Sequence, residues 1–181
     1  MHINTHTAVL GLGNPILCDD AVGLRVAEEL ERLLSADPIP GVVVMQSTRA
    51  GFELIDMLSG FHHAVIVDCL QVPEPVPGRI RELSLADFSG SARLNSAHEV
   101  NITTAFTLAR QMGAPMPQTV EIYAIEAGDT ATFTENLTPQ VAAVVGPLAQ
   151  QLLSSLSRAA VSDCRPVDGS APQPQVFYPP E

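Results

Sequence analysis

The chain has 181 residues, of which 46% are hydrophobic and 16% are charged, and its formal net charge at pH 7 is −11. This length suits one domain with a substantial core, and no apolar run approaches the ~18 residues that a membrane-spanning helix needs. The nine basic residues are all arginine and lie scattered along the chain, which argues against a nucleic-acid partner because such binding needs clustered positive charge.

The start of the chain and its cysteines indicate the compartment. Residues 1–7 are too polar for a signal peptide. The three cysteines are odd in number and lack zinc-finger spacing, so a disulfide framework is not expected. We therefore predict a cytoplasmic protein with no membrane partner.

Strand and helix patterns alternate in the first half of the chain. A helical pattern begins at Asp19, and Gly23 lies on its apolar face, so this helix is expected to approach a sheet closely. A shorter helix is predicted after the second strand. The buried strands are predicted at 8–11, 42–45 and 64–68, and the short helix at 51–58.

The second half continues this alternation. The segment "RIREL" (79–83) alternates polar and apolar residues, as a half-buried edge strand does. A helix at about 97–112 and a strand at 119–125 follow. The last helix begins at Thr138-Pro139, a good N-cap with proline at the first helical position. Its apolar period continues through Gly146-Pro147, which predicts one kinked helix.

Together these elements predict the α/β class. Alternating strands and helices imply a mostly parallel sheet of about five strands with helices on both faces. We place this single three-layer domain at residues 1–160. The Pro-rich remainder, 161–181, is expected to be a disordered tail.

Three polar residues stand out because ligands bind beyond the carboxyl ends of parallel strands. Asp20 follows the first strand and its loop, and Asp68 directly follows the apolar run "AVIV". His98 lies within a capping box formed by Ser96 and Glu99, in the first helical turn. The positive end of that helix disfavours a charged imidazole. Two carboxylates and one neutral imidazole suit borderline divalent metals such as zinc and nickel.

Several neighbouring residues have simpler interpretations. Asp19 is assigned to capping the helix that it precedes. Cys18 and Cys69 each adjoin a candidate ligand, and a thiolate there could bind metal or act as a nucleophile. Because no His–Asn arrangement of a cysteine protease is recognisable, we interpret both as passive neighbours of the site.

Five segments together resemble the nickel–iron hydrogenase maturation endopeptidases, over about residues 8–156. They are "VLGLGNPILCDDAVG", "STRAGFELIDML", "AVIVDC", "SAHEVNITTAFTLARQMG" and "ENLTPQV". The resemblance implies a single α/β/α domain with a twisted sheet that cuts a C-terminal extension from the hydrogenase large-subunit precursor after nickel insertion. It also implies that Asp20, Asp68 and His98 recognise the metal, which the precursor supplies, so that no metal need be bound permanently. We expect a monomer.

The chain departs from the family pattern at two places. Ala21 stands where glycine often follows the paired acids. The loop that resembles "DGGT-x-G" is here 46–51, which has lost its acid and gained Arg49. Arg49 could pair with a carboxylate of the precursor or simply face water. A loop at this position could contact the substrate, so its altered sequence puts in question which precursor the protein prefers.

Other functions remain alternatives. The opening "GLGNP" also resembles peptidyl-tRNA hydrolases. Those enzymes should have a catalytic histidine soon after this turn, but residues 18–21 stand in that place and include no histidine. A dinucleotide cradle would need its third glycine where Ile16 stands. A nickel-sensing chaperone that holds the precursor without cutting it would use the same three residues. If the protein is a peptidase, either the metal polarises the scissile carbonyl or a carboxylate activates water.

Overall fold

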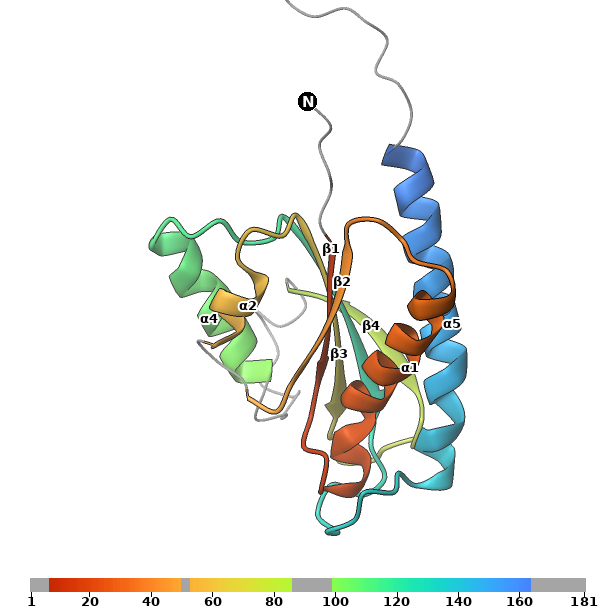
Figure 1. Cartoon of the computed structure of the whole chain (residues 1–181). Coiled ribbons are helices and arrows are strands. Elements are labelled where there is room, and N and C mark those ends of the chain that lie inside the picture. The colour runs from red at the N-terminus through yellow and green to blue at the C-terminus, as the bar shows by residue number, and fades with distance from the viewer. Residues whose placement is uncertain (1–6, 50–52, 86–98, 164–181) are drawn as a thin grey trace, which may run out of the picture.

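The computed structural model describes residues 7–49, 53–85 and 99–163, which form a five-stranded sheet covered by helices (Figure 1). The strands are β1 (Thr7–Leu12), β2 (Val42–Ser47), β3 (His63–Leu70), β4 (Ile80–Ser84) and β5 (Thr119–Glu126). The helices are α1 (Val22–Ala36), α2 (Glu53–Leu58), α4 (Glu99–Gln111) and α5 (Pro139–Asp163), and a 3-10 turn, η1 (Cys18–Ala21), precedes α1. Residues 161–163 of the tail predicted at 161–181 belong instead to the end of α5, and the rest of that tail lies outside the described residues.

The sheet has the order β2-β1-β3-β5-β4. Its first four members in this order run parallel, as the crossover helices require. β4 pairs antiparallel with β5, with Arg81 opposite Ala124. The half-buried strand predicted at 79–83 is therefore confirmed as an edge strand.

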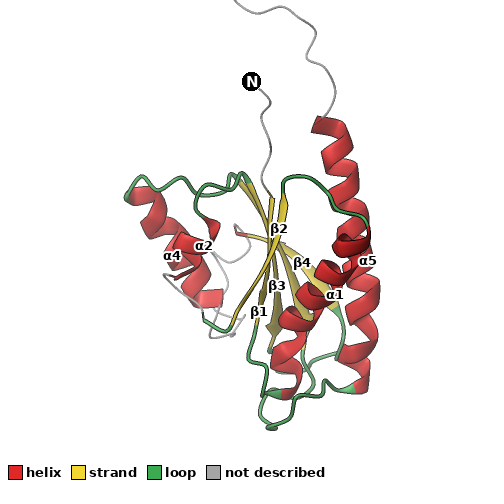
Figure 2. Cartoon of the chain, viewed as in Figure 1, coloured by secondary structure: helices red, strands yellow, loops and turns green. Residues whose placement is uncertain are grey.

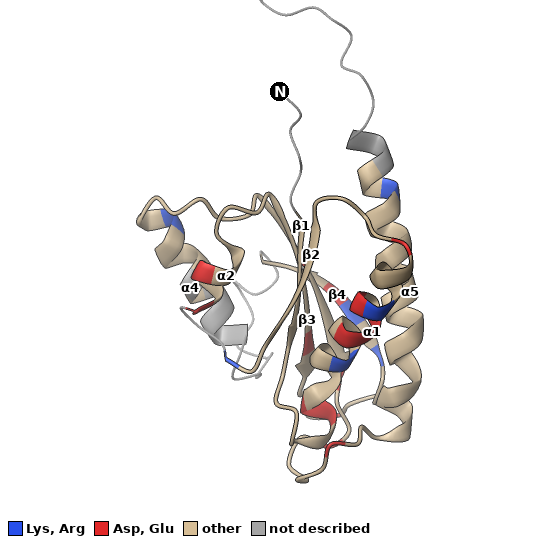
Figure 3. Cartoon of the chain, viewed as in Figure 1, with Lys and Arg blue, Asp and Glu red and all other residues tan. Residues whose placement is uncertain are grey.

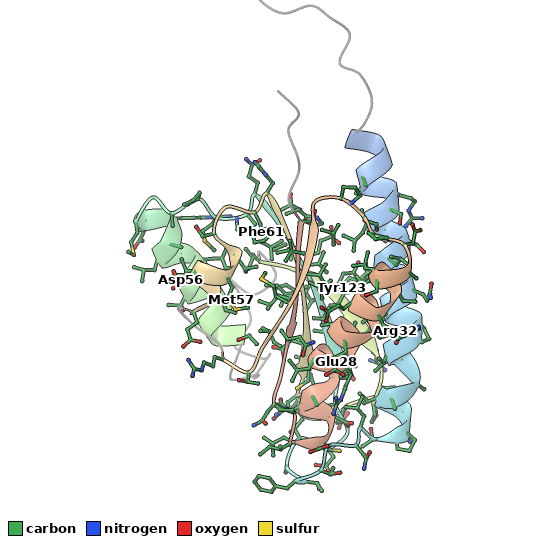
Figure 4. All side chains as sticks on the ribbon, in the orientation of Figure 1. Glu28, Arg32, Asp56, Met57, Phe61 and Tyr123 are labelled. Carbon is green, nitrogen blue, oxygen red and sulfur yellow. The ribbon has the colours of Figure 1, made fainter. Side chains whose placement is uncertain are left out.

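The helices form two layers around the sheet (Figure 2), with α1 and α5 on one face and α2 and α4 on the other. Each face has its own apolar core. Tyr123 belongs to the α1/α5 core, whereas Met57 and Phe61 pack against the α2/α4 core; Figure 4 shows them on opposite sides of the sheet. The predicted three-layer α/β/α architecture is confirmed.

Helix α1 lies close to the sheet because Gly23 has no side chain. A Cβ at this position would overlap the carbonyl oxygens of Leu12 and Val67. The outer face of the same helix carries charges of both signs (Figure 3), including the ion pairs Arg25–Glu28 and Arg32–Glu29. The close approach predicted from Gly23 is thus confirmed, and the polar face of α1 is solvated.

The first helix starts later than predicted, whereas the last helix starts where it was predicted. The helix expected from Asp19 begins at Val22, because residues 18–21 form the 3-10 turn η1 first. Cys18 in that turn has a φ of 32°, which is unusual for a residue other than glycine. Helix α5 is continuous from Pro139 and includes Pro147, as its apolar period predicts, and the kink expected there stays a prediction. None of the helices in the described ranges is long and apolar enough to cross a membrane.

Candidate functional site

The carboxyl ends of β1, β3 and β5 lie at one edge of the sheet, where the polypeptide enters η1 and the loop before α5 (Figure 1). Asp20 lies in η1. Asp68 lies in β3, which continues two residues beyond it to Leu70. Both carboxylates are shielded from solvent, Asp68 completely and Asp20 with 9% exposed. The prediction that the two acids share the carboxyl edge is borne out by this geometry.

Cys69 connects the two carboxylates. Its thiol donates a hydrogen bond to Oδ1 of Asp20, with 3.1 Å between sulfur and oxygen. Its backbone N–H donates to Oδ1 of Asp68 at 2.8 Å. Cys69 therefore contacts both acids at once, and its interpretation as neither a metal ligand nor a nucleophile stays a prediction.

The strand geometry turns Asp68 toward the α2/α4 layer. Successive side chains of a strand point to opposite faces. Val67 and Cys69 contribute to the α1/α5 core, whereas Ala64 and Ile66 contribute to the α2/α4 core. Asp68 shares the parity of Ile66, so its side chain is on the face that α4 covers.

The glycine turn after β1 positions Asp20. Gly13 has a φ of 150°, and a Cβ there would overlap the carbonyl oxygen of Asp20. That same oxygen accepts a hydrogen bond from the backbone N–H of Asn14 at 3.3 Å. Only glycine leaves room for this contact. The turn therefore packs its backbone against Asp20 and presents a carboxylate rather than an anion cradle.

Asp19 does not cap α1, so this prediction was wrong. No side chain caps α1 or η1. Instead, the fully buried carboxylate of Asp19 accepts hydrogen bonds from the N–H of Thr138 at 2.7 Å and its hydroxyl at 2.9 Å. It also accepts from the N–H groups of Gly128 at 2.8 Å and Asp129 at 3.0 Å. Asp19 thus fastens η1 to the loop after β5 and to the start of α5.

Cys18 is suited to packing rather than to nucleophilic attack. Burial raises the pKa of its thiol, and the nearby carboxylates of Asp19 and Asp129 raise it further. A thiol with a raised pKa stays protonated at neutral pH, and the thiolate is the reactive form. The interpretation of Cys18 as a passive neighbour is consistent with this environment.

His98 lies outside the described residues, as does Ser96 of its capping box. Helix α4, which begins at the very next residue, runs antiparallel to the strand that follows it and starts toward the carboxyl edge (Figure 1). Within ranges 7–49, 53–85 and 99–163, no three His, Cys, Asp or Glu side chains form a metal-binding group. The assignment of His98 as the third ligand stays a prediction.

Comparison with known proteins identifies the family. The family model for hydrogenase maturation proteases matches residues 24–155. The chain belongs to the hydrogenase maturation protease family. It is 27% identical, over 84% of this chain and 92% of its relative, to a hydrogenase 2 maturation protease of Escherichia coli. A hydrogenase expression/formation protein HupD of Thiocapsa roseopersicina is 23% identical over 99% of this chain and 80% of its own length.

Solved structures agree with this assignment. The hydrogenase maturating endopeptidase HybD from Escherichia coli superimposes with a TM-score of 0.70 at 25% identity, covering 85% of this chain and 93% of its own. A [NiFe] hydrogenase maturation protease HycI from Thermococcus kodakarensis shares the fold, with a TM-score of 0.66 at 21% identity over 84% and 93%. The protein is a peptidase of this class, with a role in processing a hydrogenase large subunit. This finding favours the protease over the peptidyl-tRNA hydrolase alternative.

The protease has a fourth buried acid, which the sequence analysis did not single out. Glu126, at the end of β5, is fully buried and pairs with Arg81 at 2.7 Å. It also accepts the N–H of Val76 at 2.6 Å. Burial by itself raises the pKa of Glu126, but the hydrogen bonds from Val76 and Arg81 outweigh it and lower the pKa overall. Side chains alternate between the two faces of a strand, and this alternation along "EIYAIE" could have indicated that Glu126 faces inward.

Arg49 of the protease pairs within the chain. Its guanidinium lies 2.8 Å from Oε1 of Glu53, four residues later, and both side chains are largely exposed. An exposed pair of this kind contributes little to stability. Arg49 therefore lies at the surface, as it would have to do either to pair with a carboxylate of the precursor or to face water.

Proposed function

We propose that this protease removes the C-terminal extension of a nickel–iron hydrogenase large-subunit precursor after nickel has been inserted. The nickel belongs to the substrate. Asp20, Asp68 and His98 engage it and so place the scissile peptide bond at the carboxyl edge of the sheet. The observation that carries this proposal is the joint contact of Cys69 with Asp20 and Asp68.

The two acids supply the oxygen ligands. Two buried carboxylates that converge on one substrate ion would repel each other without it, and a divalent cation relieves that repulsion. Oxygen donors combined with a neutral imidazole suit nickel. The position of helix α4 supports His98 as the third donor. This helix begins at the residue after His98 and covers the face of the sheet toward which Asp68 points.

This arrangement makes nickel a condition for cleavage. A precursor without the metal lacks the ion that joins it to Asp20 and Asp68, so the binding energy of that contact is lost. Once the ion is in place, it polarises the scissile carbonyl, or one carboxylate activates the attacking water. In both routes the three residues are catalytic as well as metal-binding.

The test uses a large-subunit precursor from the source organism, loaded with nickel or prepared without it. We expect a mass loss corresponding to the C-terminal extension only with nickel and the wild-type protease. Asp20→Asn, Asp68→Asn and His98→Ala should each slow cleavage at least about 100-fold, the scale of losing one charge-stabilising group. Asp37→Asn, at an exposed position, is the matched control and should cleave normally.

The outcomes separate the competing hypotheses. Cleavage at the wild-type rate by all three variants would reject the site. A stable one-to-one complex without any mass loss would favour the nickel-sensing chaperone. The monomeric state, the cytoplasmic location and the absence of a nucleic-acid partner stay predictions, and sedimentation of the purified protein tests the first of them.

A further inference from the structure

The exposed large apolar side chains are unevenly distributed over the molecule. Among the described residues they are Ile16, Val43, Val76, Met112 and Phe133. Val43 lies near the start of β2 and Met112 follows α4, both toward the amino edge of the sheet. Ile16, Val76 and Phe133 lie in loops at the carboxyl edge, the edge that carries Asp20 and Asp68.

Ile16 and Phe133 belong to segments that pair with each other. Leu17 forms isolated β-bridges with Phe133 and Thr134. The N–H of Thr134 donates to the carbonyl of Ile16 at 3.0 Å, and the N–H of Cys18 donates to the carbonyl of Thr134 at 2.9 Å. The two exposed side chains therefore lie on neighbouring pieces of backbone although 117 positions separate them in the chain (133 − 16).

This paired surface is fastened to the candidate site. The N–H of Asp20 donates to the carbonyl of Leu17 at 2.8 Å, so Ile16 is one tight turn away from Asp20. Asp19 holds the other segment through its hydrogen bonds to Gly128, Asp129 and Thr138. A surface already held in place loses little conformational entropy on binding, which favours its use as an interface.

The composition of this surface is that of an interface centre. We define the apolar rim as Pro15, Ile16 and Phe133, which are all exposed; Ile16 is 49% and Phe133 79% accessible. Segments 13–17 and 130–134 contain no charged residue, although the chain has a net charge of −11. Depletion of charge together with an aromatic side chain distinguishes the centre of protein interfaces from the remaining surface.

We propose that the apolar rim is the docking surface for an apolar segment of the large-subunit precursor, next to the bond that is cut. This inference rests on the proposed function, because it takes the precursor as the protein that must reach Asp20 and Asp68. The rim adjoins those acids, so a precursor seated over them covers Ile16 and Phe133. The rim then supplies affinity that does not depend on nickel.

The test measures binding and cleavage separately. Ile16→Ser/Phe133→Ser is compared with the wild type for binding of the nickel-loaded precursor, by interferometry, and for kcat and KM. We expect Kd and KM to rise at least tenfold, or about 1.4 kcal/mol, with kcat at saturation within twofold. Met112→Ser is the matched control, since Met112 is 73% exposed at the opposite edge, and should behave as the wild type.

Each result decides the inference, and binding by the double variant separates its failure from that of the proposed function. Unchanged Kd and KM in the double variant, with an unchanged melting temperature, would overturn it. So would an equal loss in Met112→Ser, or a wild-type protein that does not bind the precursor. A wild type that dimerises in sedimentation, and a double variant that does not, would instead assign the rim to a second copy of this chain. If the wild type binds through the rim but never cuts, the docking surface stands and the peptidase proposal fails.

Discussion

The thiol of Cys69 donates to the carboxylate of Asp20 across 49 positions of the chain, with 3.1 Å between Sγ and Oδ1. Because Cys69 directly follows Asp68, this one residue sets the position of a loop carboxylate relative to a strand carboxylate. The hydrogen bond fixes one oxygen of Asp20 against the end of β3. We infer that it orients the other oxygen for the substrate.

Replacing Cys69 tests this orientation. Cys69→Ala leaves Oδ1 of Asp20 without the thiol donor, which should cost about 1–3 kcal/mol of the free energy of unfolding. It should also slow precursor cleavage, because Asp20 is then free to rotate. Cys69→Ser keeps a donor and should recover most of the rate. Denaturant titration and cleavage kinetics measure the two effects, and an alanine variant as fast as the wild type would contradict the assignment.

Asp19 should contribute more to stability than any exposed acid of the protein. Asp19→Ala leaves four partly buried donors, on Gly128, Asp129 and Thr138, without their acceptor, at up to about 1–3 kcal/mol each where water does not replace it. We expect a total loss of about 3 kcal/mol or more in the free energy of unfolding, measured by urea denaturation. Asp37→Ala, at an exposed position, should change it by less than about 0.5 kcal/mol. Equal values for the two variants would show that the carboxylate is not a structural anchor.

Glu126 should make stability depend on acid pH. Its pKa in the folded protein lies below the ordinary value of 4.5, so its contribution is fully present above that value. The contribution is lost as the pH falls through the folded pKa, because the carboxylate must then be protonated. The free energy of unfolding should fall less steeply below pH 4.5 in Glu126→Gln than in the wild type. Glu135→Gln, on an exposed side chain, should keep the wild-type slope.

Gly23→Ala should destabilise the protein strongly. The added Cβ would overlap the carbonyl oxygens of Leu12 and Val67, which are backbone atoms and cannot move aside. Helix α1 would have to shift from the sheet, at a cost of about 1–3 kcal/mol or more. Gly146→Ala is the comparison, because nothing lies within 4 Å of the added Cβ apart from its chain neighbours and the nearby backbone of its own helix. Thermal denaturation should show a lower melting temperature for the first variant and little change for the second.

Much of the architecture followed from local patterns. Apolar runs and helical periods located the strands and helices to within a few residues, since both patterns repeat over short distances. The edge strand β4 was recognisable from alternation alone, and Gly23 from its place on an apolar helix face. Asp20 and Asp68 were located at one edge of the sheet because parallel strands bring their carboxyl ends together.

The order of elements, the class of fold and the two acids at the carboxyl edge were therefore determined by the sequence itself, through short-range periodicity and a topological rule. Only the tertiary structure decided the partners of the buried polar groups. Asp19 meets Thr138 across 119 positions, Cys69 meets Asp20 across 49, and Glu126 meets Arg81 across 45. Such pairs have no period along the chain, and they form because folding buries one polar group of each pair, which then needs a partner in place of water.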